Sequence, residues 1–292
     1  MLDYSTTDAN GDFIEIPARV DEAAVRAATS GWFVDTSGNL LVKRADGVQP
    51  TDANTRVYLN AAAFGIGSNN VDVYAENIEI HGGDSGVNAR VGNTRNVVLV
   101  DMVSKYAGSQ RAVTAGTARP SLGGNAFSFA GFATGSFIGL WRCVGARSAQ
   151  DAISSTSNSG SPFYVLTVDC VGRDCGMDGQ TSCNGLTQHV NVIGIDLNGE
   201  YHRNAGGNLR NIDSTQIWAL GTYAHDDRGD VIFGGPLNPC DFNLGGTAKA
   251  WFQDVRAANS QISLATDSST SAYLRNASLP NTKILNGAVV SY

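Results

Sequence analysis

An internal repeat in the middle of the chain constrains the fold more than any other feature. From Asn125 onward, four consecutive segments of 26 or 27 residues each open with Asn or Asp. The second half of each segment holds an apolar stretch, in order FIGLWRC, YVLTVDC, VIGIDL and IWALGTY. A strand-rich repeat of this length predicts a coil in which each turn, or rung, stacks on the next. Stacking is required because one rung cannot bury its apolar face alone.

The residues within these stretches alternate with the period of two that is typical of a strand. Cys143, Cys170 and Leu197 lie 27 residues apart and are predicted to form one inward-facing column. The same alternation predicts further inward side chains, namely Trp141, Leu166, Val168, Ile193 and Ile195. It predicts outward positions for Arg142, Asp169 and Asp196.

The repeat also predicts the domain organisation. Residues 71–240 are expected to form the rungs, with a loop insertion at 109–124, where the chain is half a rung too long. Residues 1–70 are expected to form an N-terminal cap region, because an open coil end leaves unpaired strand edges. That region has a helical pattern at 20–28, with Val20, Ala23, Ala24 and Ala27 on its apolar side, and two strands within 31–47 around Ser-Gly-Asn. Residues 241–292 are expected to add shorter closing rungs to the same domain.

Composition narrows the class of protein. The 34 glycines and the low charged fraction of 16% favour short strands and tight turns. A net charge of −7 argues against a nucleic-acid partner.

No apolar run of about 18 residues is present, so no membrane span is expected. The N-terminus has no apolar stretch typical of a signal peptide. Five cysteines without a C-x-x-C pair argue against structural zinc, and Cys143 and Cys170 are predicted to be buried small hydrophobes.

The rungs from about 71 to 240 resemble the right-handed parallel β-helix group of pectate-lyase-like proteins. This superfamily includes polysaccharide lyases, glycoside hydrolases, uronate epimerases and phage tailspikes. The segment GWFVD…LLVKRADGVQPTD, at 31–52, is similar to an N-terminal segment of bacterial β-helix enzymes. The resemblance implies an all-β, right-handed parallel β-helix solenoid with rungs of about 26 residues. It also implies a carbohydrate-active protein.

The column of Asn and Asp that opens the segments admits two interpretations. Its members are Asn125, Asp151, Asp178, Asn204 and Asp230. In the geometric one, these residues adopt left-handed backbone conformations and satisfy amide groups at corners. In the functional one, Asp151 and Asp178 on adjacent rungs lie about 5 Å apart, which suits the carboxylate pair of a retaining glycosidase. Asp178 and Asp230, about 10 Å apart, would lie at the upper limit for an inverting pair.

A second set of polar residues precedes that column on successive rungs. Its members are Arg147, Arg173, Asp174, Glu200, Tyr201, His202, Arg203, His225, Asp226, Asp227 and Arg228. Polar residues at one angular position predict a charged stripe along the coil, either as an exposed turn surface or as a groove for a sugar chain. In the second case the substrate-binding residues are Arg147, Arg173, Asp174, Arg203, Asp226, Asp227 and Arg228, with the arginines holding uronate carboxylates.

The catalytic candidates are Tyr201, His202 and His225 as acid or base, besides Asp151, Asp178 and Asp230. Asp226 and Asp227 would orient a histidine or hold Ca²⁺, the one cofactor considered, and no residue is assigned as a metal ligand. The chain lacks the N-T-D, G-H-G and R-I-K set of polygalacturonases, which weakens a hydrolase assignment.

The leading hypothesis is a protein that cleaves or modifies an acidic polysaccharide, as a lyase or as a hydrolase. The alternative is a non-catalytic module of a phage tail fibre, an adhesin or a glycan-binding shaft, as a homotrimer if phage-derived. Either function predicts an extracellular or virion-associated protein.

Overall fold

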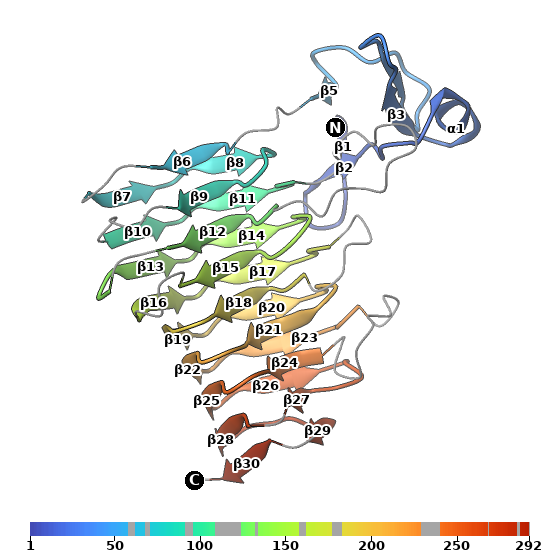
Figure 1. Cartoon of the computed structure of the whole chain (residues 1–292). Helices are drawn as coiled ribbons and strands as arrows, with labels where there is room; N and C mark the ends of the chain where they lie inside the picture. Colours follow the sequence, from blue (N-terminus) through green and yellow to red (C-terminus); the bar gives the residue numbers. More distant parts are fainter. Residues whose placement is uncertain are drawn as a thin grey trace. The chain divides into compact units, whose positions relative to one another are not determined.

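The computed structural model of the chain describes residues 1–57, 62–67, 71–90, 96–108, 124–131, 134–157, 162–176, 183–228, 240–267, 269–284 and 287–291. The chain divides into two compact units, of which the described parts are residues 1–57 and the residues from 62 onward. The second unit is a right-handed parallel β-helix, built from three long parallel sheets (Figure 1). The predicted fold class is therefore confirmed.

Each of the first seven rungs contributes one strand to each sheet in the order I, II, III, and the last two rungs contribute strands to sheets I and II only in the part of the chain that the structure describes. Sheet I contains β6 (Phe64–Ile66), β9 (Val87–Arg90), β12 (Phe127–Ala130), β15 (Ile153–Thr156), β18 (Leu186–His189), β21 (Gly207–Asn211), β24 (Cys240–Leu244), β27 (Leu264–Thr266) and β29 (Thr282–Ile284). Sheet II contains β7 (Asp72–Glu76), β10 (Asn96–Val100), β13 (Phe137–Trp141), β16 (Phe163–Val168), β19 (Val192–Leu197), β22 (Gln216–Leu220), β25 (Lys249–Gln253), β28 (Ser271–Arg275) and β30 (Ala288–Ser291). Sheet III contains β8 (Glu79–His81), β11 (Val103–Lys105), β14 (Val144–Ala146), β17 (Val171–Arg173), β20 (Glu200–His202), β23 (Tyr223–His225) and β26 (Arg256–Ala258).

The bend between sheets II and III is made by residues with left-handed backbone conformation, and it changes the predicted faces. Arg142, Asp169 and Asn198 occupy this bend, with φ of 51°, 51° and 55°. Each bend interrupts the two-residue alternation. Cys143 and Cys170, after the bend, do face inward as predicted, but they are not in phase with the strand before it.

Before the bend, the predicted faces are therefore reversed. On β19, Asp196 is buried and Ile195 is 42% exposed, and on β16 the buried residues are Phe163, Val165 and Thr167 rather than Leu166 and Val168. Trp141, Ile193 and Leu197 also point outward. Leu197 pairs with Val168 and not with Cys170, so the predicted column of three is wrong at its third member.

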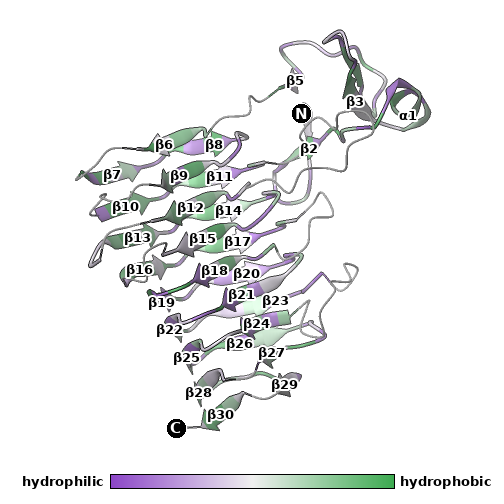
Figure 2. Cartoon of the chain, viewed as in Figure 1, coloured by the Kyte–Doolittle hydropathy of each residue, from purple (hydrophilic) through white to green (hydrophobic). Residues whose placement is uncertain are grey.

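The interior of the coil is a continuous apolar stack that encloses the carboxylate of Asp196. Its largest buried side chains include Phe127, Phe129, Phe163 and Phe242, and Figure 2 shows hydrophobic residues recurring along the strands. The Asp196 carboxylate accepts three hydrogen bonds from hydroxyl groups. Their donors are Tyr201 (2.7 Å), Thr167 (2.5 Å) and Thr222 (2.5 Å). Burial raises the pKa of Asp196, and these three bonds partly offset that effect.

The outer face of sheet II has an apolar residue or glycine at the central outward position of every strand, flanked by polar residues on the strands near both ends, and we call it the apolar face. Its exposed members are Tyr74, Tyr164, Ile195, Leu220 and Val290. Half-buried Trp218, Trp251 and Tyr273 follow one another on β22, β25 and β28, with ring centroids 4.4 and 5.2 Å apart and nearly parallel planes. Because each stacked ring covers the face of the next, this ladder presents ring edges rather than ring faces to solvent.

The first unit is held by antiparallel pairing and one buried arginine. Strands β2 (Phe13–Glu15), β1 (Leu2–Thr7) and β5 (Thr55–Arg56) form one sheet, and β3 (Gly31–Val34) pairs with β4 (Leu40–Lys43) around the predicted Ser-Gly-Asn turn. The guanidinium of Arg44 donates to Asp46 Oδ2 (2.6 Å), Ser5 Oγ (2.6 Å) and the Asn54 carbonyl (2.6 Å). It also lies 3.2 Å from the carboxylate of the buried Asp3. This group ties β1 to the segment after β4.

The predicted helix at 20–28 is present as α1 (Glu22–Ala27), but its buried side differs. Asp21 accepts a hydrogen bond from the Ala24 amide (2.7 Å) and so caps the first turn. Val25 is the buried residue of the helix, whereas Val20 is 55% exposed. A helix of under two turns has room for one inward position only. The pattern of four apolar residues therefore predicted a larger buried side than the helix has. None of the helices in the described residues is long and apolar enough to cross a bilayer.

Candidate functional site

The outer face of sheet III aligns side chains from successive rungs into columns. In one column, Glu79, Val103, Val144, Val171, Glu200, Tyr223 and Arg256 lie in register. In the next outward column, the aligned residues are His81, Lys105, Ala146, Arg173, His202, His225 and Ala258. The intervening residues point into the coil. We call the part of this surface on β20, β23 and β26 the sheet III site.

Three titratable groups of the sheet III site lie close together. The nearest nitrogen and oxygen atoms of Glu200, His202 and His225 all lie within 4.8 Å of one another. The imidazole rings of His202 and His225 stack with centroids 4.7 Å apart and an interplanar angle of 8°. His225 Nε2 lies 3.1 Å from Glu200 Oε1, and its Nδ1 lies 2.5 Å from Asp226 Oδ2. Neither ring nitrogen of His202 has a hydrogen-bond partner within the described residues, and each is thus available to a ligand.

An aromatic ring and a cation complete the sheet III site. Tyr223 stacks on His225, with centroids 4.2 Å apart. The guanidinium carbon of Arg256 lies 4.8 Å from the centroid of the Tyr223 ring. Arg256 is exposed, and among the described residues no carboxylate forms an ion pair with it. Strand β23, which carries Tyr223 and His225, lies between the strands of His202 and Arg256. A substrate carboxylate bound to this guanidinium would therefore lie at one end of the site.

A charged ladder borders the site at the bend that follows sheet III. Arg147, Asp174, Arg203 and Asp226 occupy equivalent positions on successive rungs, and all have left-handed φ between 51° and 58°. Arg203 donates two hydrogen bonds to Asp174, of 2.7 and 2.6 Å, and Arg173 donates a third, of 2.8 Å. Opposite charges therefore alternate along the axis, which stabilises the stacked bends and fixes the two arginines.

Burial and neighbouring charges set the protonation of the site. Burial lowers the pKa of His202, and the adjacent His225 lowers it further. Burial alone would raise the pKa of Asp226, but hydrogen bonds with His225 and Asn259 hold it below its usual range. Burial raises the pKa of Asp227, whose Oδ2 accepts from the Gln261 amide (3.0 Å). His202 is therefore biased towards its neutral form, which a general base requires.

The structure brings together most of the predicted stripe. His202, His225, Arg173, Asp174, Arg203 and Asp226 lie at or beside the sheet III site, and Arg147 continues the charged ladder. Asp227 and Arg228 follow the site in sequence. The side chains of Asp226 and Asp227 have different partners, His225 and Gln261, so they do not converge on one another.

Tyr201 and Asp151 lie away from that surface. Tyr201 is fully buried inside the coil, where its hydroxyl donates to Asp196. Asp151 is buried at a corner, and its Oδ1 accepts from both the amide and the side chain of Asn184, each at 2.8 Å. The corner column thus continues from Asn125 and Asp151 to Asn184, whose Oδ1 in turn accepts from the Gly207 amide (2.8 Å). These residues satisfy amide groups at the corners, as the geometric interpretation predicts, but none of them adopts the left-handed backbone conformation that it also predicts.

Three further predictions fall wholly or mainly outside the described residues. Asp178, predicted to pair either with Asp151 or with Asp230, lies there, as does Asp230. So does the predicted loop insertion at 109–124, except for Gly124.

Sequence reasoning assigned no role to Glu200, Tyr223 or Arg256. The sequence does place two of them beside the predicted histidines. Glu200 and Tyr223 each precede a histidine by two residues and so lie on the same face of its strand. Arg256 could be placed only from the register of β23 with β26.

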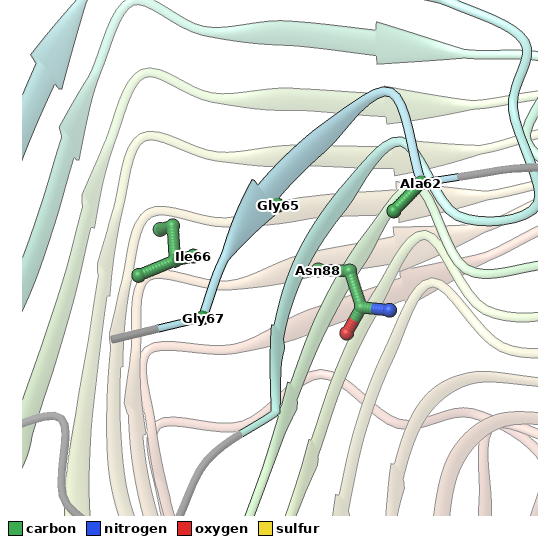
Figure 3. Close-up of a pocket in the computed structure, with 5 residues that line it drawn as sticks. All are labelled: Ala62, Gly65, Ile66, Gly67 and Asn88. Atoms are coloured by element: carbon green, nitrogen blue, oxygen red, sulfur yellow. The ribbon is translucent and has the colours of Figure 1, made fainter. Parts of the chain in front are cut away.

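A pocket of about 290 Å³ lies at the first rung and is unsuited to catalysis. Figure 3 shows its lining residues, Ala62, Gly65, Ile66, Gly67 and Asn88, from β6, β9 and their flanks. None of these five carries a titratable side chain. The sheet III site therefore remains the better candidate.

Comparisons with known proteins give the chain no relative. No family model, no curated protein and no solved structure matches it.

Proposed function

We propose that this chain is a carbohydrate-active member of the pectate-lyase-like superfamily, and that it binds and modifies an acidic polysaccharide at the sheet III site. The observation that carries the proposal is the cluster of Glu200, His202 and His225, with Arg256 two strands further along the same face of sheet III. Successive rungs repeat every ~4.8 Å, so that a linear sugar chain lying along the axis meets equivalent positions in turn.

Local charge supports an anionic substrate. The chain as a whole has a net charge of −7. The sheet III site and its charged ladder nonetheless contain as many cationic as anionic side chains, and Arg256 is exposed on β26, the strand next to that of His225. A guanidinium binds a uronate carboxylate through two parallel hydrogen bonds. An exposed cation on an acidic protein is therefore a selective contact for such a sugar.

The chemistry that fits best is β-elimination. His202 removes the proton on the carbon that bears the carboxylate, and Arg256 balances the charge that develops on the carboxylate. The electron pair forms a carbon–carbon double bond and breaks the bond to the glycosidic oxygen. That oxygen leaves with the Nε2 proton of His225, which transfers from its longer contact with Glu200 while Nδ1 stays bonded to Asp226. Glu200 and Asp226 orient His225 through its two ring nitrogens.

The test is a panel of uronate-containing and neutral polysaccharides incubated with the purified chain. Elimination produces an unsaturated sugar that absorbs in the ultraviolet, whereas hydrolysis produces reducing ends without that absorbance. Turnover limited to uronate polymers, with rising absorbance, is the expected result. If none of the polymers is bound or cleaved, the proposal is wrong.

A second candidate function, that of an oligomeric shaft or tail-fibre module, is favoured by the apolar face. Nine strands at ~4.8 Å and about five residues at ~3.3 Å give the whole outer face of sheet II roughly 700 Å², with an apolar residue or glycine at the central outward position of each strand. A standard interface buries about 800 Å² on each partner and is itself only partly apolar, so this face is large enough to form one. The occupant proposed here is the same face of two further copies, in a homotrimer.

Light scattering coupled to size exclusion tests this second candidate. Wild type is expected to run as a trimer, and Ile195→Lys combined with Tyr164→Lys as a monomer, because both residues lie on the apolar face. Val48→Lys replaces an exposed residue of the first unit and is the matched control. A wild-type monomer at all concentrations would contradict the shaft function.

A further inference from the structure

We infer that Glu200, His202 and His225 form a binding site for a divalent transition-metal ion, and that Zn²⁺ fits it best. The three ligand atoms lie within 4.8 Å of one another. Glu200 and His202 point outward from the same strand, β20, and His225 is in register with His202 on β23. All three side chains are thus delivered to one point by strand pairing rather than by a loop.

One pair of ligands already has the separation that an ion requires. Bonds of about 2.1 Å at tetrahedral angles leave neighbouring ligand atoms roughly 3.3 Å apart. His225 Nε2 and Glu200 Oε1 are 3.1 Å apart. The imidazole of His202 stacks on that of His225 at 4.7 Å, so its nitrogen must tilt towards the ion. His202 is partly exposed, and a rotation of its side chain leaves the core undisturbed.

Asp226 provides an independent indication of a metal site. Its Oδ2 lies 2.5 Å from Nδ1 of His225. Histidine ligands in metal sites usually donate their second ring N–H to a carboxylate, which orients the ring and leaves the other nitrogen for the metal. Asp226 therefore directs the lone pair of Nε2 towards Glu200, on the side where the ion would bind.

The ligand set selects the class of metal. Two imidazole nitrogens and one carboxylate oxygen suit Zn²⁺, and three protein ligands leave a fourth position for water or substrate. Ca²⁺ prefers six to eight oxygen ligands and does not match this set. The site would bind the ion whether or not the chain acts on polysaccharide. Occupation would, however, take the nitrogen of His202 that the proposed elimination uses, so Zn²⁺ is expected to inhibit turnover.

The chain contains a close copy of this arrangement that lacks one ligand. Glu79 and His81 on β8 have the same spacing as Glu200 and His202, and His81 Nε2 lies 2.7 Å from Glu79 Oε1. The residue in register with His81 on the next rung is Lys105, whose ammonium lies 3.7 Å from Glu79. A cation there replaces the second imidazole, so we expect no metal ion at β8.

Calorimetric titration of the chelator-treated full chain with Zn²⁺ alone tests the inference, and visible absorption of bound Co²⁺ reports the ligand geometry. Wild type is expected to bind one ion per chain. His202→Gln and Glu200→Gln should each weaken binding at least 100-fold, and Asp226→Asn about 10- to 100-fold. His81→Gln is the matched control and should bind as wild type does. Lys105→His should raise the stoichiometry to two ions.

Two results would overturn the inference. One is a wild-type chain that takes up no Zn²⁺ or Co²⁺ at micromolar concentrations. The other is binding that His202→Gln and Glu200→Gln leave unchanged. Because the Glu200 side chain is 48% exposed, its variant decides the matter even if a histidine variant does not fold. The experiment measures metal uptake and not turnover. The metal site can therefore be confirmed or refuted even if the chain turns over no polysaccharide.

Discussion

Replacing the buried Asp241 by asparagine is predicted to remove a pH-dependent cost to stability. Oδ1 of this carboxyl accepts hydrogen bonds from Asn208 (2.8 Å) and Ser260 (2.7 Å). Its Oδ2 is buried and has no hydrogen-bond partner within the described residues. Burial raises the pKa of Asp241 from 3.8 to about 7. The amide of the Asp241→Asn variant would keep the acceptor oxygen and remain uncharged at every pH.

The sign and size follow from linkage between protonation and folding. The folded state holds the proton of Asp241 more tightly than the unfolded state does, so stability is lost as the pH rises from about 4 to 7. At 1.36 kcal/mol for each pKa unit, the full cost above pH 7 is about 4 kcal/mol. Between pH 5 and pH 8, the stability advantage of Asp241→Asn over wild type should grow by about 3 kcal/mol, the part of the window above pH 5.

Urea denaturation of both proteins at pH 5 and pH 8 measures this difference. Circular dichroism and tryptophan fluorescence must give the same midpoint before a two-state free energy is assigned, because solenoids can unfold in parts. Asp72→Asn, at an exposed position of β7, controls for the loss of one negative charge. An equal difference between Asp241→Asn and wild type at both pH values would refute the reasoning.

Three further predictions concern the buried groups of the two units. Tyr201→Phe should cost about 1–3 kcal/mol, because it removes one donor to the buried Asp196, and it should leave polysaccharide turnover intact. Lost turnover at unchanged stability would instead make Tyr201 catalytic. Arg44→Ala should destabilise residues 1–57 by about 3 kcal/mol, measured by hydrogen exchange, since it leaves the buried Asp3 with hydrogen bonds from Ser5 but without its cation. Protection equal to that of wild type would argue against this. A thiol reagent should modify no cysteine in the native chain and five after denaturation, because all five are buried and unpaired; reaction of the native chain would contradict it.

The sequence predicted the coil because every rung repeats a strand with alternating residues. It misassigned the strand faces because the bend residues Arg142, Asp169 and Asn198 are polar and resemble outward strand positions. A left-handed residue shifts the phase of the alternation without changing its appearance in the sequence.

Variable rung length explains why the predicted column of Asn and Asp residues is wrong after Asp151. Ile153 pairs with Leu186, so the corner column passes from Asp151 to Asn184 instead of to Asp178. A constant repeat of 26 or 27 residues cannot reveal where a rung is longer.

The stripe at sheet III was predictable because its members recur at equivalent rung positions. The roles within it depend on alternation in strands of only three residues, where the middle residue turns inward. This alternation buries Tyr201 and exposes Glu200 and His202 on either side. Arg256 enters the site only through the pairing of β23 with β26, on which no local pattern reports.

The most direct test of the central claim compares kcat/KM of wild type, His202→Gln and His81→Gln on the uronate polymer with the highest turnover. Both histidines lie in the same outward column of sheet III, but only His202 is next to His225. Loss of a general base costs about 100-fold or more. We predict such a loss for His202→Gln and an unchanged rate for His81→Gln. Equal rates for the two variants would contradict the assignment of function to the sheet III site.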